Sequence, residues 1–164
     1  MTTLRNVDAS SPTECSALIA LALTTGLFTE EEAEHLLGAT LDGIASGALS
    51  PPSHAARLAL DPASGRAVGW TYTARDEHAE GVFELMWIGV GEEEQGRGAG
   101  KLLLLDAEDH ARRNGGRLML VCTSSQPATE RARAFYERRG YAQCGRIPNF
   151  YAEGDDKVIF VKQL

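Results

Sequence analysis

The sequence has 164 residues, of which 43% are hydrophobic and 24% charged, and its formal net charge is −7 at pH 7. This length predicts one globular domain over residues 1–164, large enough to bury a core without disulfide bonds or a structural metal. The acidic balance disfavours nucleic acid as a partner, because neutralising phosphates needs a basic face.

Targeting signals and metal-binding patterns are absent from the sequence. Its longest apolar stretches fall far short of the roughly 20 residues that cross a bilayer, and residues 1–8 lack the basic flank and apolar run of a signal peptide. Cys15, Cys122 and Cys144 form no C-x-x-C pair, and the histidines complete no zinc pattern. We therefore expect a cytoplasmic protein with reduced thiols, no metal and no membrane partner.

The first part of the chain reads as a short strand followed by helices. Residues 4–7 predict the strand, and Ser11 with Pro12 predicts a helix start, since proline is tolerated at the first helical position. Thr29 and Glu32 match a capping box, and apolar residues continue beyond it at helical spacing. The pattern therefore predicts two helices after the first strand.

The rest of the chain alternates between strands and helices. Residues 54–60 and 67–75 predict a hairpin joined by the turn sequence D-P-A-S-G, and residues 82–90 form the strongest strand pattern. The remaining expected elements are a helix at 101–113, a strand at 117–123, a helix at 129–139 and one or two further strands at the C-terminal end. This order predicts an α+β (mixed α/β) domain with a central mixed sheet.

A glycine-rich loop between the strand at 82–90 and the next helix is the most informative segment. From Val90 to Lys101 it reads V-G-E-E-E-Q-G-R-G-A-G-K. Glycines let backbone amides approach a ligand closely, and the free N–H groups and dipole of the following helix favour an anion such as a phosphate. Arg97 and Lys101 add positive charge beside it.

The spacing of this loop excludes two common nucleotide motifs. A Walker A loop needs a glycine five residues before its Gly-Lys pair and a Ser or Thr after the lysine, but Gln95 and Leu102 occupy those positions. A dinucleotide-binding fingerprint needs G-x-G-x-x-G in a parallel unit. The sequence has G-x-G-x-G instead, and the strands before it read as antiparallel.

The loop instead resembles the pyrophosphate loop of the GNAT acetyltransferase superfamily, Q/R-x-x-G-x-G/A, with Gln95, Gly98 and Gly100 at the matching positions. Residues 133–141, R-A-F-Y-E-R-R-G-Y, are similar to the segment A-x-x-F-Y-E-x-x-G-F of that family. Residues 84–90 look like its strand before the loop, and residues 147–159 resemble the tyrosine-bearing tail of bacterial members. Motifs in the right order along one chain make the match specific.

The resemblance implies a fold, a co-substrate and a set of contacts. The fold would have a central mixed, mostly antiparallel sheet of about six to seven strands, about four flanking helices, and a V-shaped splay between the fourth and fifth strands. Acetyl-CoA would be the co-substrate, with its pantetheine arm in that splay. The residues implied to contact it are Ile88, Gly89, Val90, Gln95, Gly96, Arg97, Gly98, Ala99, Gly100, Lys101 and Thr129. Thr129 stands where many relatives carry an asparagine.

Acetyl transfer to an amine needs a neutral amine, donors for the developing oxyanion and a proton for the departing sulfur. Glu84 is the candidate general base, acting directly or through a water, because a carboxylate in an apolar strand is costly unless it is paired or used. Strand alternation predicts one shared face for Glu84, Met86, Ile88 and Val90. The alternative for Glu84 is an ion pair or an exposed strand end.

Tyr136 is the candidate acid for the thiolate, on the strength of the resemblance. The alternative is a tyrosine that only completes the core. The oxyanion donor would be a backbone N–H near Ile88. Since no nucleophile–base arrangement such as G-x-S-x-G occurs, direct attack in a ternary complex is favoured over a covalent enzyme intermediate.

Three functions remain open from the sequence. The favoured one is an N-acetyltransferase acting on a primary amine of a small molecule or amino acid, as a monomer or homodimer, because the compact chain carries no added recognition domain. The second is a protein acetyltransferase for an N-terminal amine or a lysine. The third is a non-catalytic acyl-CoA-binding sensor, in which Glu84 and Tyr136 are packing residues.

Overall fold

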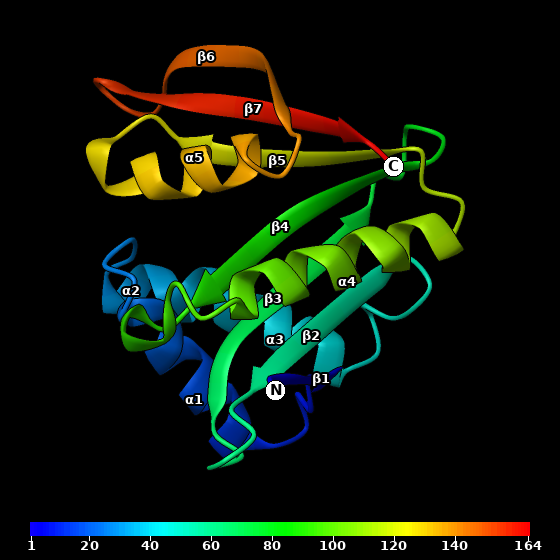
Figure 1. The fold of residues 1–164 in the computed structure, drawn as a ribbon, viewed down its shortest axis with the longest axis vertical. Helices are drawn as coiled ribbons and strands as arrows, with labels where there is room; N and C mark the ends of the chain where they lie inside the picture. Colours follow the sequence, from blue (N-terminus) through cyan, green and yellow to red (C-terminus); the bar gives the residue numbers. More distant parts are fainter.

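The computed structural model describes residues 1–164 and contains one seven-stranded sheet with helices on both faces (Figure 1). The sheet order is β1-β2-β3-β4-β5-β7-β6, and β4 and β5 form the one parallel pair. The strands are β1 (Thr3–Asn6), β2 (His54–Leu60), β3 (Ala67–Arg75), β4 (Val82–Val90), β5 (Leu118–Ser124), β6 (Ala142–Ala152) and β7 (Asp155–Gln163). The helices are α1 (Pro12–Leu23), α2 (Glu30–Ala33), α3 (Ala39–Ala45), α4 (Ala99–Arg113) and α5 (Glu130–Glu137). The predicted mixed, mostly antiparallel α+β fold is confirmed.

The expected helix-start signals are present near the N-terminus. The Ser11 hydroxyl accepts a hydrogen bond from the Glu14 amide at 3.3 Å and caps α1. The Thr29 hydroxyl accepts from the Glu32 amide at 3.2 Å while the Glu32 carboxylate accepts from the Thr29 amide at 2.8 Å, which completes the capping box. A π-helical segment, η1 (Glu34–Gly38), joins α2 to α3, so the two form one irregular helical segment.

The predicted bounds of β2, β3 and β4 agree with the structure, whereas two helix starts differ. α4 begins at Ala99, because Gly98 takes a left-handed conformation and ends the loop there. The segment at 127–129 is a 3-10 turn, η3 (Pro127–Thr129), so α5 begins at Glu130 and is shorter than the predicted helix. Two further strands, β6 and β7, form the C-terminal hairpin.

A β-bulge at Met86 reverses the alternation of β4. The register between β3 and β4 leaves Met86 without an opposite residue. Leu85 before the bulge and Ile88 after it therefore both pack into the core that includes α4. The expectation that Glu84, Ile88 and Val90 share one face is wrong. One inserted residue moves every later side chain of the strand to the other face of the sheet. Glu84 lies on the opposite face of the sheet.

Two principal cores lie on the two faces of the sheet. One joins α1, α2 and η1 to Leu58, Trp70 and Tyr72 of the sheet. The other joins α4 and α5 to Phe83, Phe160 and their neighbours. In Figure 1, α4 crosses one face of β2, β3 and β4. Tyr136 of α5 packs in one core with Val121 of β5 and Phe160 of β7. No helix of the fold is both long and apolar enough to span a membrane.

Candidate active site

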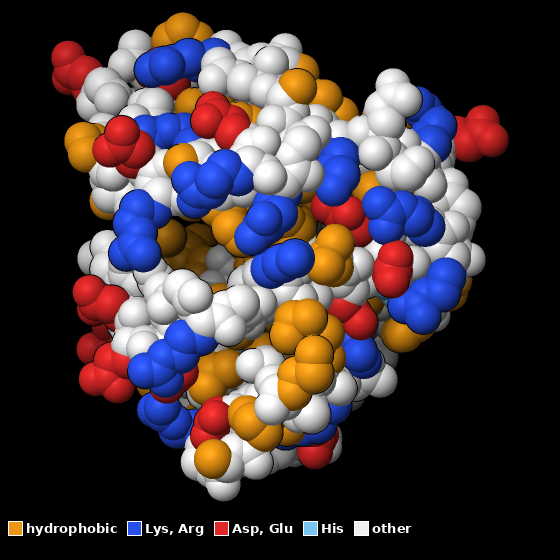
Figure 2. Space-filling model, viewed as in Figure 1, with side chains coloured by type: hydrophobic (Ala, Val, Ile, Leu, Met, Phe, Trp, Pro, Cys, Tyr) orange, Lys and Arg blue, Asp and Glu red, His pale blue; other side chains and the backbone are white.

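The predicted splay between the fourth and fifth strands is present. β4 and β5 pair at Val82–Leu118, Phe83–Met119 and Glu84–Leu120, and at no later position. Beyond this point β4 continues along β3, and β5 continues along β7. The backbone groups of residues 85–90 that face β5 therefore have no strand partner. Figure 2 shows the surface hollowed between α5 and the last part of β4, with Lys and Arg side chains around the rim.

The loop after β4 is built so that its backbone faces open space. Gly96 and Gly98 have positive φ angles of 81° and 94°, a conformation that favours glycine. A Cβ added at either position would meet no atom within 4 Å. The Gln95 side chain donates to the Val90 carbonyl at 3.2 Å, which ties the loop to the strand it leaves.

The N-terminus of α4 has free hydrogen-bond donors. Gly98 is the N-cap and supplies no side-chain cap, so the amides of Ala99, Gly100 and Lys101 have no capping partner. Gly100 lies close to Phe135 of α5, since an added Cβ would be in van der Waals contact with that ring at 3.8 Å. Free amides, a helix dipole and an exposed lysine form an arrangement that fits a diphosphate.

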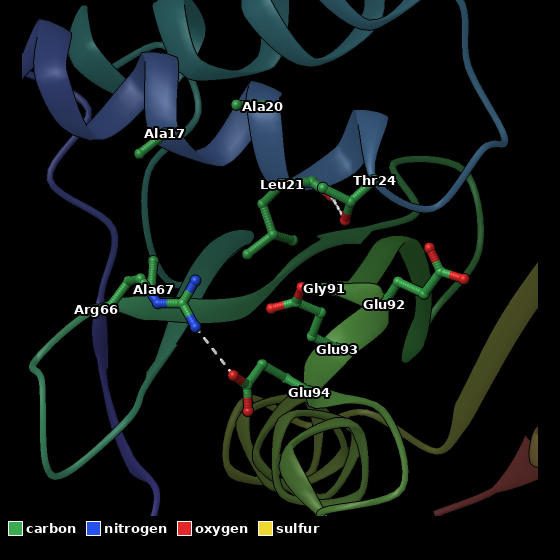
Figure 3. A pocket seen from close by; sticks show the side chains of 10 residues that line it. All are labelled: Ala17, Ala20, Leu21, Thr24, Arg66, Ala67, Gly91, Glu92, Glu93 and Glu94. Atoms are coloured by element: carbon green, nitrogen blue, oxygen red, sulfur yellow. Dashed lines mark hydrogen bonds and ion pairs between the residues drawn. The ribbon is translucent and has the colours of Figure 1, made fainter.

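The acidic run of this loop is partly neutralised. The Glu94 carboxylate pairs with Arg66 at 3.0 Å and with Arg97 at 2.9 Å, so Arg97 is turned toward an acid within its own loop. Figure 3 shows the Arg66–Glu94 pair beside a cavity of about 450 Å³ between α1 and the loop. Glu92 and Glu93 also line this cavity and are exposed, consistent with a solvated charge run.

Glu84 lies at the point where β4 and β5 separate. It is the last β4 residue paired with β5, and its side chain is half-buried. Burial raises the pKa of the Cys122 thiol to about 11, and the negative charge of Glu84 adds to that shift. Burial likewise raises the pKa of Tyr151, with smaller contributions from Cys122, Asp155 and Glu84. Glu84 of β4, Cys122 of β5 and Tyr151 of β6 therefore lie near one another.

Tyr136 lies in the core between α5 and the sheet. Only 6% of its surface is exposed, and its ring packs against Phe135, Tyr141 and Phe160 with centroid distances of 5.6, 5.9 and 5.9 Å. Burial alone raises the pKa of its hydroxyl well above the ordinary value of a phenol. A phenol in this state keeps its proton at neutral pH, which a proton donor requires.

Thr129 uses its hydroxyl within the chain. That hydroxyl is 2.7 Å from the Ser124 carbonyl and 2.9 Å from the Gln126 carbonyl, and it accepts from Arg133 at 2.6 Å. Arg133 also donates to the Ser124 carbonyl at 2.8 Å. These bonds hold the turn between β5 and α5, and so they set the start of the helix that carries Tyr136.

Several residues near Glu84 were not among the predicted site residues. Cys122, Tyr151 and Lys157 come from three different strands, and only the sheet register brings them to one face. The Trp87 ring, which packs on Phe28 at 5.3 Å, follows Glu84 on the same side of β4. Among the sequence signals, the tyrosine-bearing tail pointed to this region.

Comparisons with known proteins agree with this geometry. Residues 21–141 match the family model for the acetyltransferase (GNAT) family. A GNAT-family acetyltransferase from Desulfovibrio desulfuricans is 27% identical, each chain is covered to 99%, and the TM-score is 0.87. An aminoglycoside 6′-N-acetyltransferase complexed with coenzyme A is 18% identical, with 98% of this chain and 96% of that chain covered and a TM-score of 0.77.

A third solved structure is similar in fold. The ribosomal-protein alanine N-acetyltransferase from Escherichia coli is 17% identical, with 99% of this chain and 94% of that chain covered and a TM-score of 0.72. No curated protein sequence gives a significant match. The match to the family model covers most of the chain, and the chain therefore belongs to the GNAT acetyltransferase family. It is an acyltransferase.

Proposed function

We propose that this enzyme transfers the acetyl group of acetyl-CoA to a primary amine of a small molecule or amino acid. The observation that carries this proposal is the position of Glu84 at the vertex of the split between β4 and β5. There the Glu84 carboxylate lies next to the unpaired backbone of residues 85–90 and next to the sheet face that points away from α5. A thioester in the split and an amine on that face would meet beside Glu84.

The co-substrate contacts follow from the loop and the split. Bound acetyl-CoA supplies an activated acetyl group. The amides of residues 96–101 bind its diphosphate, with Lys101 adding charge, while the unpaired backbone of Ile88, Gly89 and Val90 borders the pantetheine arm. Gln95 keeps the loop in shape through its bond to the Val90 carbonyl. Thr129 positions the start of α5, in place of a direct contact with the arm.

The proton steps are assigned to two side chains. Glu84 takes a proton from the incoming ammonium, directly or through a water, because only a neutral amine has the lone pair needed for attack. Tyr136 holds a proton for the departing sulfur. A backbone N–H near Ile88 stabilises the negative charge that develops on the acetyl oxygen. The attack is direct, within a ternary complex.

The proposal is tested by free-thiol release from acetyl-CoA with a panel of amines, using the wild-type protein and Glu84→Gln. The wild type should turn over at least one amine, and Glu84→Gln should lower kcat/KM about 10²- to 10⁴-fold without weakening coenzyme A binding. Acetylation of peptides in a lysate but of no small amine would favour a protein acceptor instead. Coenzyme A binding without any turnover would favour a sensor.

A further inference from the structure

The sheet carries a second half-buried face beside the split, on the side away from α5. Val121 of β5 and Phe160 of β7 point into the core with Tyr136. Cys122, next to Val121, and Lys157, next to the core residue Val158, therefore point the other way, since side chains alternate along a strand. Glu84 lies between Phe83 and Leu85, which both belong to that core, and it precedes the bulge at Met86. Its side chain therefore points to this outer face.

Opposite charges flank the centre of this face. Along β5, Cys122 lies between Leu120, which pairs with Glu84, and Ser124, which pairs with Lys157. Lys157 pairs with Ser124 across β5 and β7, so it lies further along β5 than Leu120, the partner of Glu84. The carboxylate and the ammonium thus border one surface from two directions.

The Lys157 ammonium has no acidic partner within ion-pair distance. It lies 4.6 Å from the centre of the Phe150 ring. The nearest acids in sequence are engaged elsewhere. Asp155 accepts from the Ser124 hydroxyl at 2.6 Å and from the Ser125 amide at 3.2 Å. Asp156 accepts from Arg146 and from the Asn149 amide. A half-buried, unpaired cation next to a candidate amine site is available for an anion.

The same face has aromatic walls. Tyr151, 49% exposed, packs edge-on against Phe150 with ring centroids 5.0 Å apart. Trp87 lies on the Glu84 side and packs on Phe28. Aromatic side chains that are partly exposed supply apolar contact to the body of a small ligand.

We propose that the acceptor is an amino-acid-like zwitterion, whose amine lies at Glu84 and whose anionic group is bound by Lys157, with an apolar or aromatic body between Trp87 and the Phe150–Tyr151 pair. This inference rests on the proposed function and narrows its substrate class. It disfavours a polycation as acceptor, because Lys157 would repel additional positive charges.

The test compares amines that differ only in a carboxylate. The intact protein is assayed by thiol release with phenylalanine against phenethylamine, with para-aminomethylbenzoate against benzylamine, and with spermidine as the polycation. We expect kcat/KM to be about tenfold higher for the carboxylate-bearing member of at least one pair, which corresponds to one added charged contact. Spermidine should be the poorer substrate.

Variants at Lys157 assign the preference to its charge. Lys157→Met keeps most of the stem and should abolish the preference for the carboxylate, measured as the ratio of kcat/KM between the two amines of a pair, by raising KM of the carboxylate-bearing amine. Lys157→Arg keeps the charge and should retain the preference. Equal melting temperatures of the two variants would show that both are folded.

The outcomes separate this inference from the proposed function. Turnover in which carboxylate-free amines or spermidine react as well as the zwitterions, or a preference that survives in Lys157→Met, would overturn the inference and leave the acetyltransferase assignment standing. No thiol release with any amine would contradict both the inference and the proposed acetyltransferase function.

Discussion

Two residues that the resemblance implies to contact acetyl-CoA, Gln95 and Thr129, form hydrogen bonds within the chain. Gln95 matches the first position of the loop motif, yet its side chain braces the Val90 carbonyl. Thr129 stands where relatives carry an asparagine, and its hydroxyl bonds to two carbonyls and to Arg133 within the chain. A motif therefore predicts where a residue lies better than which atom it contacts.

Tyr136 provides a test in which one oxygen atom is removed. Tyr136→Phe keeps the ring packed in the core, so the fold should persist, while kcat should fall about 10²-fold with KM for acetyl-CoA unchanged, because the sulfur leaves without its proton donor. Steady-state thiol release measures both constants. Unchanged kcat would make Tyr136 a packing residue.

The raised pKa of Tyr136 gives the same variant a second readout. Its hydroxyl holds a proton more tightly in the folded chain than at the ordinary value of 10.0, so this contribution to stability is present below pH 10 and is lost as the pH rises above it. The melting temperature of the wild type should therefore drop above pH 10, and it should drop less in Tyr136→Phe. Burial also raises the pKa of Tyr141, so part of the fall in melting temperature above pH 10 should remain in both proteins.

Among the elements of the fold, the strand–loop–helix unit from β4 to α4 is the one that we propose to bind coenzyme A. Its strand pattern and its glycine spacing are both local, and the sequence was sufficient to predict them. The bulge at Met86 was not predictable, because it depends on the register with β3 rather than on the β4 sequence itself. The consequence was a wrong assignment of which residues share the face of Glu84.

Gly98→Ala tests the loop. A Cβ there meets no neighbour, but the φ of 94° is strained for alanine, at a cost of about 1–2 kcal/mol, and a methyl group beside the free amides would hinder a diphosphate. We expect weaker coenzyme A binding by calorimetry together with a lower melting temperature.

Gly47→Ala is the matched control for that variant. Gly47 has a φ of 77°, also meets no atom within 4 Å, and follows α3 outside the loop between β4 and α4. It should lose similar stability and keep its affinity for coenzyme A. Equal loss of affinity in both variants would mean that backbone strain alone, rather than the loop, governs binding.

At the scale of the whole molecule, a buried ionic cluster joins α4 to the C-terminal hairpin. Glu108 is 1% exposed, and its carboxylate accepts from Lys162 at 2.8 and 3.0 Å, from Tyr141 at 3.1 Å and from Arg112 at 3.2 Å. The cluster lies on the α4 side of the split and holds β7 against the helix whose N-terminus faces the loop.

Removing this carboxylate should weaken the fold. Glu108→Ala leaves a partly buried lysine unpaired and should lower the free energy of unfolding in urea by about 3 kcal/mol. Asp109→Ala breaks an exposed pair with Arg112 and should cost less than about 1 kcal/mol. Similar losses in the two variants would contradict a structural role for the buried cluster.

The fold and the co-substrate loop were accessible from sequence because their signals are local or shared with a family. The acceptor face was not, since Glu84, Cys122, Tyr151 and Lys157 come from four strands whose neighbourhood depends on long-range pairing. Single-sequence periodicity contains no information about which strands lie next to one another.

We expect the backbone between residues 96 and 101 and the open edge of β4 to bind coenzyme A. Backbone amide signals in NMR spectra of the intact protein, followed during a coenzyme A titration, measure this binding at each residue. We predict saturable shifts that are largest at Gly96–Lys101 and along residues 85–90. If saturating coenzyme A leaves those amide signals unchanged, the cofactor does not bind at this loop and strand edge.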